Sequence, residues 1–108
     1  MASSVIPKTV EKWEQIGSAG ASGNTTLWHN INDYKCIAWY LINNSTSALE
    51  GYFCVSVSVF KQYNSTSKSM GINAYNSGRQ YAYLNYVSAT TAGVQLSTGR
   101  SVAIWGIK

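Results

Sequence analysis

The strongest constraint on the fold is a run of alternating side chains between residues 52 and 60. Its odd positions hold only apolar side chains: Phe53, Val55, Val57 and Val59. The even positions mix serine, cysteine and aromatic residues. Side chains along a β-strand point to opposite faces in turn, so one face of this segment meets a core and the other is largely polar or lies under a neighbour. The run therefore predicts a strand over residues 52–60.

Similar segments recur along the chain at a spacing of roughly ten residues, which is typical of all-β proteins. Besides 52–60, the expected strands cover residues 11–17, 25–31, 34–42, 70–75, 80–88, 93–97 and 101–107. Stretches rich in Gly, Ser and Asn separate them, and the stretch 17–24 is expected to be a flexible loop. No segment has a sustained helical period. We therefore expect an all-β fold, an antiparallel β-sandwich or barrel of about seven to eight short strands.

Residues 34–42 are apolar almost throughout, so we expect this strand to be covered on both sides. Cys36 belongs to this run and Cys54 to the run at 52–60. We interpret both cysteines as buried thiols that behave as small apolar residues. The alternative is a cross-strand disulfide, which requires the two strands to be close neighbours.

The length of 108 residues suits one domain. We expect residues 1–10 to be an N-terminal lead and residues 11–108 to form a single β-sandwich domain. The lead opens with Met-Ala-Ser-Ser, which resembles an expression start, so the natural protein is expected to continue upstream. A domain of this size buries roughly two thirds of the surface of its unfolded chain, and oligomerisation is an obvious way to add burial.

The distribution of charge and the lengths of the apolar stretches argue against two classes of partner. The net charge of +4 comes from eight Lys and Arg residues, no two of which are adjacent. A nucleic-acid-binding surface requires clustered positive charge, so we expect no nucleic-acid partner. No apolar stretch approaches the ~20 residues that span a bilayer, so we expect no membrane insertion.

The sequence offers little catalytic chemistry. Its carboxylates are Glu11, Glu14, Asp33 and Glu50, and Asp33 with Glu50 is the one pair that a glycosidase could use. His29 with Asp33 and a serine lacks the motifs that accompany a catalytic triad, which favours a structural histidine. Two cysteines and one histidine do not make a standard closed zinc site. We expect no enzyme activity, no metal and no cofactor.

Aromatic residues are conspicuously numerous in this sequence. Four tryptophans and eight tyrosines exceed what the core of so small a domain needs. Aromatic rings stack on sugars and fill protein interfaces, so the surplus indicates binding. Trp39 and Trp105 lie in apolar strands and are expected in the core. The candidate binding residues, which sequence alone cannot divide between ligand and subunit contacts, are Trp28, His29, Tyr34, Tyr63, Tyr75, Tyr81 and Tyr83.

Four segments together give a resemblance to a known family: residues 13–18, 53–59, 81–86 and 102–108. They resemble the C-terminal tip domains of bacteriophage and prophage tail-fibre or receptor-binding proteins, in which a tryptophan-plus-glycine opening, a run of strands and a final V-x-I-W/Y-G-I/R-K strand recur. The likeness spans nearly all of residues 12–108. No ligand residues are fixed across such domains, so the resemblance transfers none to this chain.

The resemblance implies a homotrimeric antiparallel head that recognises a bacterial surface glycan or protein receptor. Such a head lies at the distal end of the tail fibre in the virion and is made in the cytoplasm of the bacterial host. The main hypothesis is therefore a non-catalytic receptor-binding tip. The alternatives are a structural trimerisation or capping module without receptor binding, and a fragment of a glycan-cleaving tailspike.

Overall fold

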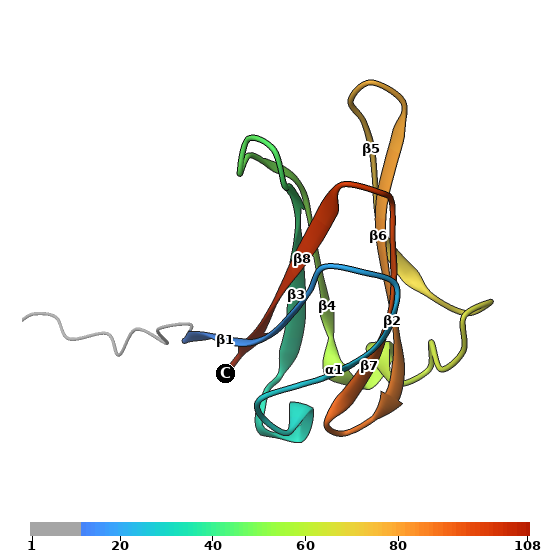
Figure 1. Ribbon diagram of the computed structural model, residues 1–108. Helices are drawn as coiled ribbons and strands as arrows, with labels where there is room; N and C mark the ends of the chain where they lie inside the picture. Colours follow the sequence, from blue (N-terminus) through green and yellow to red (C-terminus); the bar gives the residue numbers. More distant parts are fainter. Residues whose placement is uncertain (1–11) are drawn as a thin grey trace, which may run out of the picture.

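The computed structural model describes residues 12–108, which form two antiparallel four-stranded sheets (Figure 1). Sheet A has the order β1 (Trp13–Ala19), β8 (Arg100–Ile107), β3 (Cys36–Asn43) and β4 (Leu49–Ser56). Sheet B has the order β2 (Gly23–Thr26), β7 (Thr91–Leu96), β6 (Arg79–Ser88) and β5 (Met70–Tyr75). The all-β antiparallel fold that the sequence predicts is confirmed, with eight strands and no closed barrel. The expected lead at 1–10 and residue 11 lie outside the described residues.

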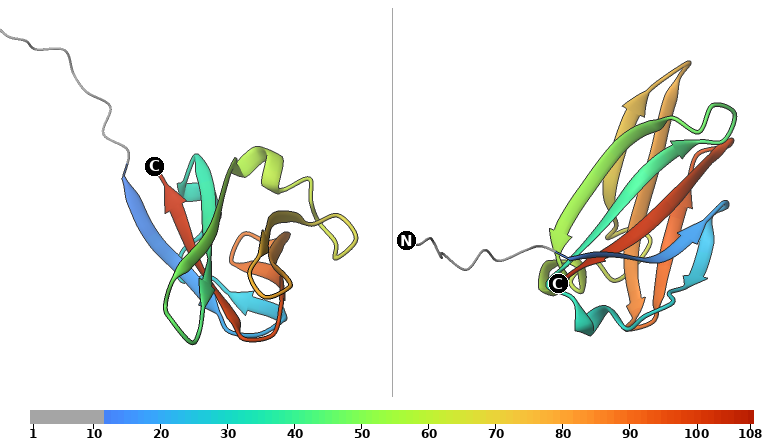
Figure 2. Two further views of the ribbon diagram at one scale, coloured as in Figure 1. Left: turned by 90° about the horizontal axis from the view of Figure 1, so that it is seen from above. Right: turned by 90° about the vertical axis from the view of Figure 1, so that its left-hand side faces the viewer.

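The chain passes between the sheets several times. β3 and β4 form a hairpin in sheet A, whereas β5, β6 and β7 follow one another in sheet B. β8 then returns to sheet A and pairs with both β1 and β3, as Figure 2 shows for the red strand. The last strand is therefore hydrogen-bonded on both sides, inside the sheet.

The core lies between the sheets and centres on Trp39 of β3, whose side chain is fully buried. Its indole Nε1 donates a hydrogen bond across the core to the carbonyl oxygen of Ala82 in β6, at 3.2 Å. The ring centroids of Phe53 and Phe60 lie 5.1 and 6.0 Å from that of Trp39. The expectation that Trp39 packs in the core is confirmed.

The expected strand at 52–60 is wrong in its second half. β4 ends at Ser56, and Val57–Phe60 form the one-turn helix α1. The Ser56 hydroxyl accepts a hydrogen bond from the Val59 amide at 3.3 Å, which is the favoured way to begin a helix. Val57 and Phe60 are three positions apart and therefore share one face of the turn, where both are buried. The hydrogen bond to Ser56 and the burial of Val57 and Phe60 therefore favour a helical turn over the strand that the alternating pattern predicts.

The expected strand at 25–31 is also only partly correct. β2 is confined to Gly23–Thr26, and Ile31–Asp33 form a 3₁₀ turn. The Asn30 side chain accepts a hydrogen bond from the Asn32 amide at 2.8 Å, which caps the turn and places Ile31 in the core. The expected loop at 17–24 is shorter than its composition suggests, because β1 continues to Ala19.

The expectation that residues 34–42 are covered on both sides holds for only one side. Ile37, Trp39 and Leu41 are fully buried between the sheets, whereas most residues on the outer side of β3 are partly exposed. Both cysteines lie on this outer side as thiols, with Cys36 half-buried and Cys54 exposed. Their expected burial is therefore wrong. Cys54 is the register partner of Ala38 rather than of Cys36, so the two cysteines are diagonal neighbours.

The Trp39 contact predicts a clear effect on stability. Trp39→Phe removes the hydrogen bond to Ala82 and leaves a void between the sheets, so we expect the free energy of unfolding to fall by about 2 kcal/mol. Urea denaturation measures it. Trp28→Phe is the matched control, because Trp28 is 57% exposed, and it should change stability by less than about 0.5 kcal/mol. Equal effects of the two substitutions would contradict the bridging role of Trp39.

Candidate functional site

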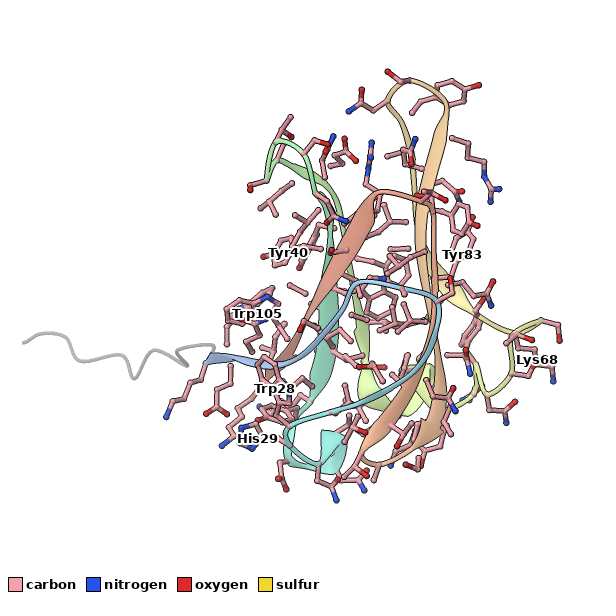
Figure 3. All side chains as sticks on the ribbon, viewed as in Figure 1. Trp28, His29, Tyr40, Lys68, Tyr83 and Trp105 are labelled. Atoms are coloured by element: carbon pink, nitrogen blue, oxygen red, sulfur yellow. The ribbon has the colours of Figure 1, made fainter. Side chains whose placement is uncertain are left out.

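The two sheets present chemically different outer faces. In Figure 3, Tyr40 and Trp105 lie on one side of the molecule, and Tyr83 and Lys68 lie on the other. Residues 12–108 enclose no pocket. A ligand of this part of the chain therefore has to bind across an exposed face or on a loop.

The outer face of sheet B gathers three of the tyrosines that the sequence predicts as binding residues. Ala82 and Leu84 point into the core, so Tyr81 and Tyr83 point outward from the same strand. Tyr75 belongs to this surface, because it is the register partner of Arg79 at the end of the β5–β6 hairpin. We call Asn73, Tyr75, Arg79, Tyr81 and Tyr83 the tyrosine face.

The side chains of the tyrosine face hold one another in place. The rings of Tyr81 and Tyr83 are stacked with their centroids 5.3 Å apart and their planes 19° apart. The Arg79 guanidinium carbon lies 4.9 Å from the Tyr81 centroid and 5.8 Å from that of Tyr83, which is cation–π geometry. Arg79 Nη2 donates to the Tyr83 hydroxyl at 2.6 Å, and Nε donates to Asn73 Oδ1 at 3.1 Å. The Tyr83 hydroxyl in turn donates to Asn73 Oδ1.

The hairpin that carries this face projects at the top of Figure 1 and is tied to sheet A by Glu50 of β4. The Glu50 carboxylate accepts hydrogen bonds from Asn76, which follows β5, and from Asn43 at 3.1 Å. It also forms an ion pair with Arg100, and both side chains are about nine-tenths buried. The hydrogen bond from Asn76, with those from Arg100 and Asn43, lowers the pKa of Glu50 against the opposing effect of burial. A buried carboxylate thus fixes the hairpin tip.

The loop at 61–69 borders the tyrosine face. Gln95, the register partner of Tyr83, donates from Nε2 to the carbonyl oxygen of Thr66 at 2.9 Å. Tyr63, another predicted binding residue, is half-buried at the start of this loop, and its carbonyl oxygen accepts from the Tyr86 amide at 2.7 Å. The loop is therefore attached to sheet B at two points.

The other predicted binding residues lie elsewhere. Trp28 and His29 are exposed in the connection between β2 and the 3₁₀ turn, on the side of Figure 3 away from Tyr83. Tyr34 is buried against Gly106 and belongs to the core cluster, so its ring does not contribute to a surface site. Burial and the hydrogen bond with Glu14 raise the pKa of the Tyr34 phenol, and the same hydrogen bond lowers the pKa of Glu14.

The outer face of sheet A carries aromatic residues that the sequence analysis missed. The centroid of Tyr52 lies 5.3 Å from that of Tyr40 and 6.2 Å from that of Trp13. Trp105 also lies here, because it pairs with Ala38 on the outer side of β3, so its expected place in the core is wrong. The signal was present in the sequence: Val102 and Ile104 alternate with Ala103 and Trp105, and only one of the two sets can face the core.

We call Trp13, Tyr40, Tyr52 and Trp105 the aromatic face. The strand positions that point outward around them carry no charged side chain within residues 12–108. The Trp105 indole nitrogen is buried and has no hydrogen-bond partner among the described residues. This surface is therefore uncharged, in contrast to the tyrosine face.

The structure separates Asp33 and Glu50, the two carboxylates that a glycosidase could use as a pair. Asp33 precedes β3 and Glu50 follows the β3–β4 turn, so they lie at opposite ends of a strand that spans about 26 Å. Within residues 12–108, no group of three or more His, Cys, Asp or Glu side chains is placed to hold a metal ion. No helix in the same range is long and apolar enough to cross a membrane.

The Glu50 network predicts how stability depends on pH. Because the folded-state pKa of Glu50 lies below its ordinary value of 4.5, the carboxylate stabilises the fold fully above that pH. Its contribution is lost as the pH falls through the folded-state pKa.

We therefore expect Glu50→Gln to lower the melting temperature at neutral pH and to weaken its decline between about pH 5 and about pH 3. Thermal unfolding followed by circular dichroism measures both. Glu14→Gln is the comparison. The pKa of Glu14 is also lowered, so this substitution should also weaken the decline, but Glu14 lies on β1 and its loss leaves the hairpin contacts of Glu50 in place. A decline in Glu50→Gln as steep as that of the unaltered protein would contradict this role.

Comparison with known proteins adds no relative: no family model matches the chain, and no curated protein or solved structure is significantly similar to it. The resemblance to tail-fibre tip domains stays a prediction, and function has to be argued from the chemistry of the two faces.

Proposed function

We propose that this domain is a non-catalytic receptor-binding module that recognises a glycan on a bacterial cell surface through the tyrosine face. The observation that carries the proposal is the stacked pair of half-buried Tyr81 and Tyr83, held by Arg79 on the outer face of sheet B. The resemblance to tail-fibre tips supplies the setting, which is the distal end of a virion fibre assembled in the bacterial host.

The chemistry of the tyrosine face suits a sugar. Aromatic rings offer apolar surface to the C–H side of a sugar, while phenol, amide and guanidinium groups offer hydrogen bonds to its hydroxyls. The contacts of Arg79 with Asn73 and Tyr83 already hold these side chains, so binding requires little further ordering. A face without a pocket suits a polysaccharide that lies across it better than a small, enclosed ligand.

A single site of this kind is expected to bind weakly, because few side chains contact the ligand. Several copies at one fibre end would raise the overall affinity by avidity, provided that the glycan array allows simultaneous contact. Weak individual sites are therefore compatible with stable attachment.

Removing the tyrosines tests the proposal. A glycan array of bacterial surface polysaccharides should identify a ligand, and biolayer interferometry gives its dissociation constant. We expect Tyr81→Ala or Tyr83→Ala to weaken binding about tenfold, equivalent to about 1.4 kcal/mol. Trp28→Ala is the matched control, because this aromatic side chain is 57% exposed in the connection after β2 and belongs to neither face. Equal losses in all three variants, or no glycan bound by the unaltered domain, would count against the proposal.

The aromatic face favours a second function, that of an oligomerisation module such as a trimeric fibre cap. Interface cores are enriched in aromatic residues and depleted of charge, as this face is. Four strands of seven to eight residues present roughly 500 Å², given strands about 4.8 Å apart and about 3.3 Å per residue. This is the same order as the roughly 800 Å² that each partner buries in a stable complex. The two functions use opposite faces and are compatible.

The second function predicts an association that a charge disrupts. Multi-angle light scattering should give a mass that is a multiple of 11.8 kDa for the unaltered chain. Tyr52→Glu should return the mass to that of a monomer, since it places a charge in the aromatic face. Val87→Glu, on an exposed residue of β6 in sheet B, should leave the mass unchanged. An unaltered chain that is monomeric at micromolar concentration would exclude this function for the isolated domain.

A further inference from the structure

We infer that the glycan bound at the tyrosine face is acidic, with a carboxylate or phosphate group that Arg79 recognises. The inference rests on the proposed function and adds the chemical class of the ligand. It follows from how charge is distributed over the two sheets, and from how the guanidinium is held.

The chain separates its charges along the sequence. Every carboxylate side chain lies in the first 50 residues, and residues 51–108 contain no Asp or Glu. The strands of sheet B therefore carry no carboxylate, because β2 also lacks one. The positive charges after residue 50 are Lys61, Lys68, Arg79, Arg100 and Lys108.

The ion pairs within residues 12–108 use only the cations of sheet A and its end. Arg100 pairs with Glu50, and Lys108 Nζ lies 3.4 Å from Glu14 Oε1. Arg79 has no carboxylate partner among the described residues, and neither has Lys68. The tyrosine face thus has an uncompensated positive charge at its centre, where an anionic group would gain most.

Arg79 is oriented for recognition rather than simply solvated. Asn73 and Tyr83 each accept one of its hydrogen bonds, and the rings of Tyr81 and Tyr83 lie beside its plane. A guanidinium has five N–H groups, so donors remain for a ligand. Its planar fork matches the two oxygens of a carboxylate or phosphate, and charge-assisted pairs of this kind are stronger than neutral hydrogen bonds.

Lys68 adds positive charge on the same side. It belongs to the loop that Gln95 holds through Thr66, and Gln95 is the register partner of Tyr83. Figure 3 shows Lys68 and Tyr83 on the same side of the molecule. Because Lys68 is exposed, salt screens the attraction of its ammonium group for an anion, so we expect Lys68 to assist mainly at low salt.

The test compares tetragalacturonate with its methyl ester, which has the same rings without the charges, by isothermal titration calorimetry. We expect the acid to bind at least tenfold more tightly, and the difference to shrink as sodium chloride rises from about 50 mM to about 500 mM. Galacturonate and mannose 6-phosphate as competitors show whether the site prefers carboxylate or phosphate. Equal affinity for acid and ester, or no binding of either, would overturn the inference.

Variants assign the preference to Arg79. Arg79→Gln should reduce the ratio of acid to ester affinity to near one, and Arg79→Lys should keep only part of it, because the charge remains without the planar fork. Lys68→Gln should reduce the preference at low salt only. Lys35→Gln removes one charge from an exposed residue before β3 and should leave the ratio unchanged. An Arg79→Gln protein that keeps the full preference would contradict the role of Arg79.

The outcomes separate this inference from the function on which it rests. A neutral glycan that binds as tightly as its acidic counterpart and is lost in Tyr83→Ala would leave the tyrosine face as the receptor site while overturning the acidic class. Binding of the acid that is insensitive to Tyr81→Ala and Tyr83→Ala would overturn both.

Discussion

The arrangement of the whole domain depends on the contact that Trp39 makes across the core. Its indole fills the space between the sheets and donates a hydrogen bond to the carbonyl oxygen of Ala82. Ala82 lies between Tyr81 and Tyr83 in β6, so the backbone that receives this bond carries the stacked tyrosines on its other side. The residue that closes the core is thus hydrogen-bonded to the strand from which the proposed binding site projects.

Much of the fold could be predicted because alternation is a local property of a strand. The expected strand at 70–75 agrees with β5 residue for residue, and the expected strands at 80–88 and 101–107 agree with β6 and β8 to within one residue. The failures occur where a side chain offers the backbone another partner. Ser56 begins a helical turn and Asn30 caps a 3₁₀ turn. In both places a side chain hydrogen-bonds to a backbone amide instead of leaving it to a strand, and the hydrophobic pattern does not reveal this.

The candidate site was predictable only in part, because a face is assembled from strands that are distant in sequence. Tyr75, Tyr81 and Tyr83 could be proposed from their type and spacing. Arg79 could not, since its contact with Asn73 depends on the β5–β6 register. The aromatic face was missed for the same reason: its residues come from four strands. The alternation in β8 indicates that either Trp105 or Ile104 faces outward, but only the sheet order places Trp105 on the same surface as Tyr40 and Tyr52. The positive character of the tyrosine face does have a signal in the sequence, because residues 51–108 contain no Asp or Glu.

The two sheets of this small sandwich present faces of different chemistry, and we propose that the polar, cationic face of sheet B binds the ligand and that the uncharged face of sheet A does not. Chemical-shift mapping of the ¹⁵N-labelled domain during titration with tetragalacturonate tests this most directly. We expect the largest amide shifts in β5 and β6 and at Gln95 of β7, with little change in β1, β3, β4 and β8. Shifts that concentrate around Tyr40, Tyr52 and Trp105, or that fail to appear, would contradict it.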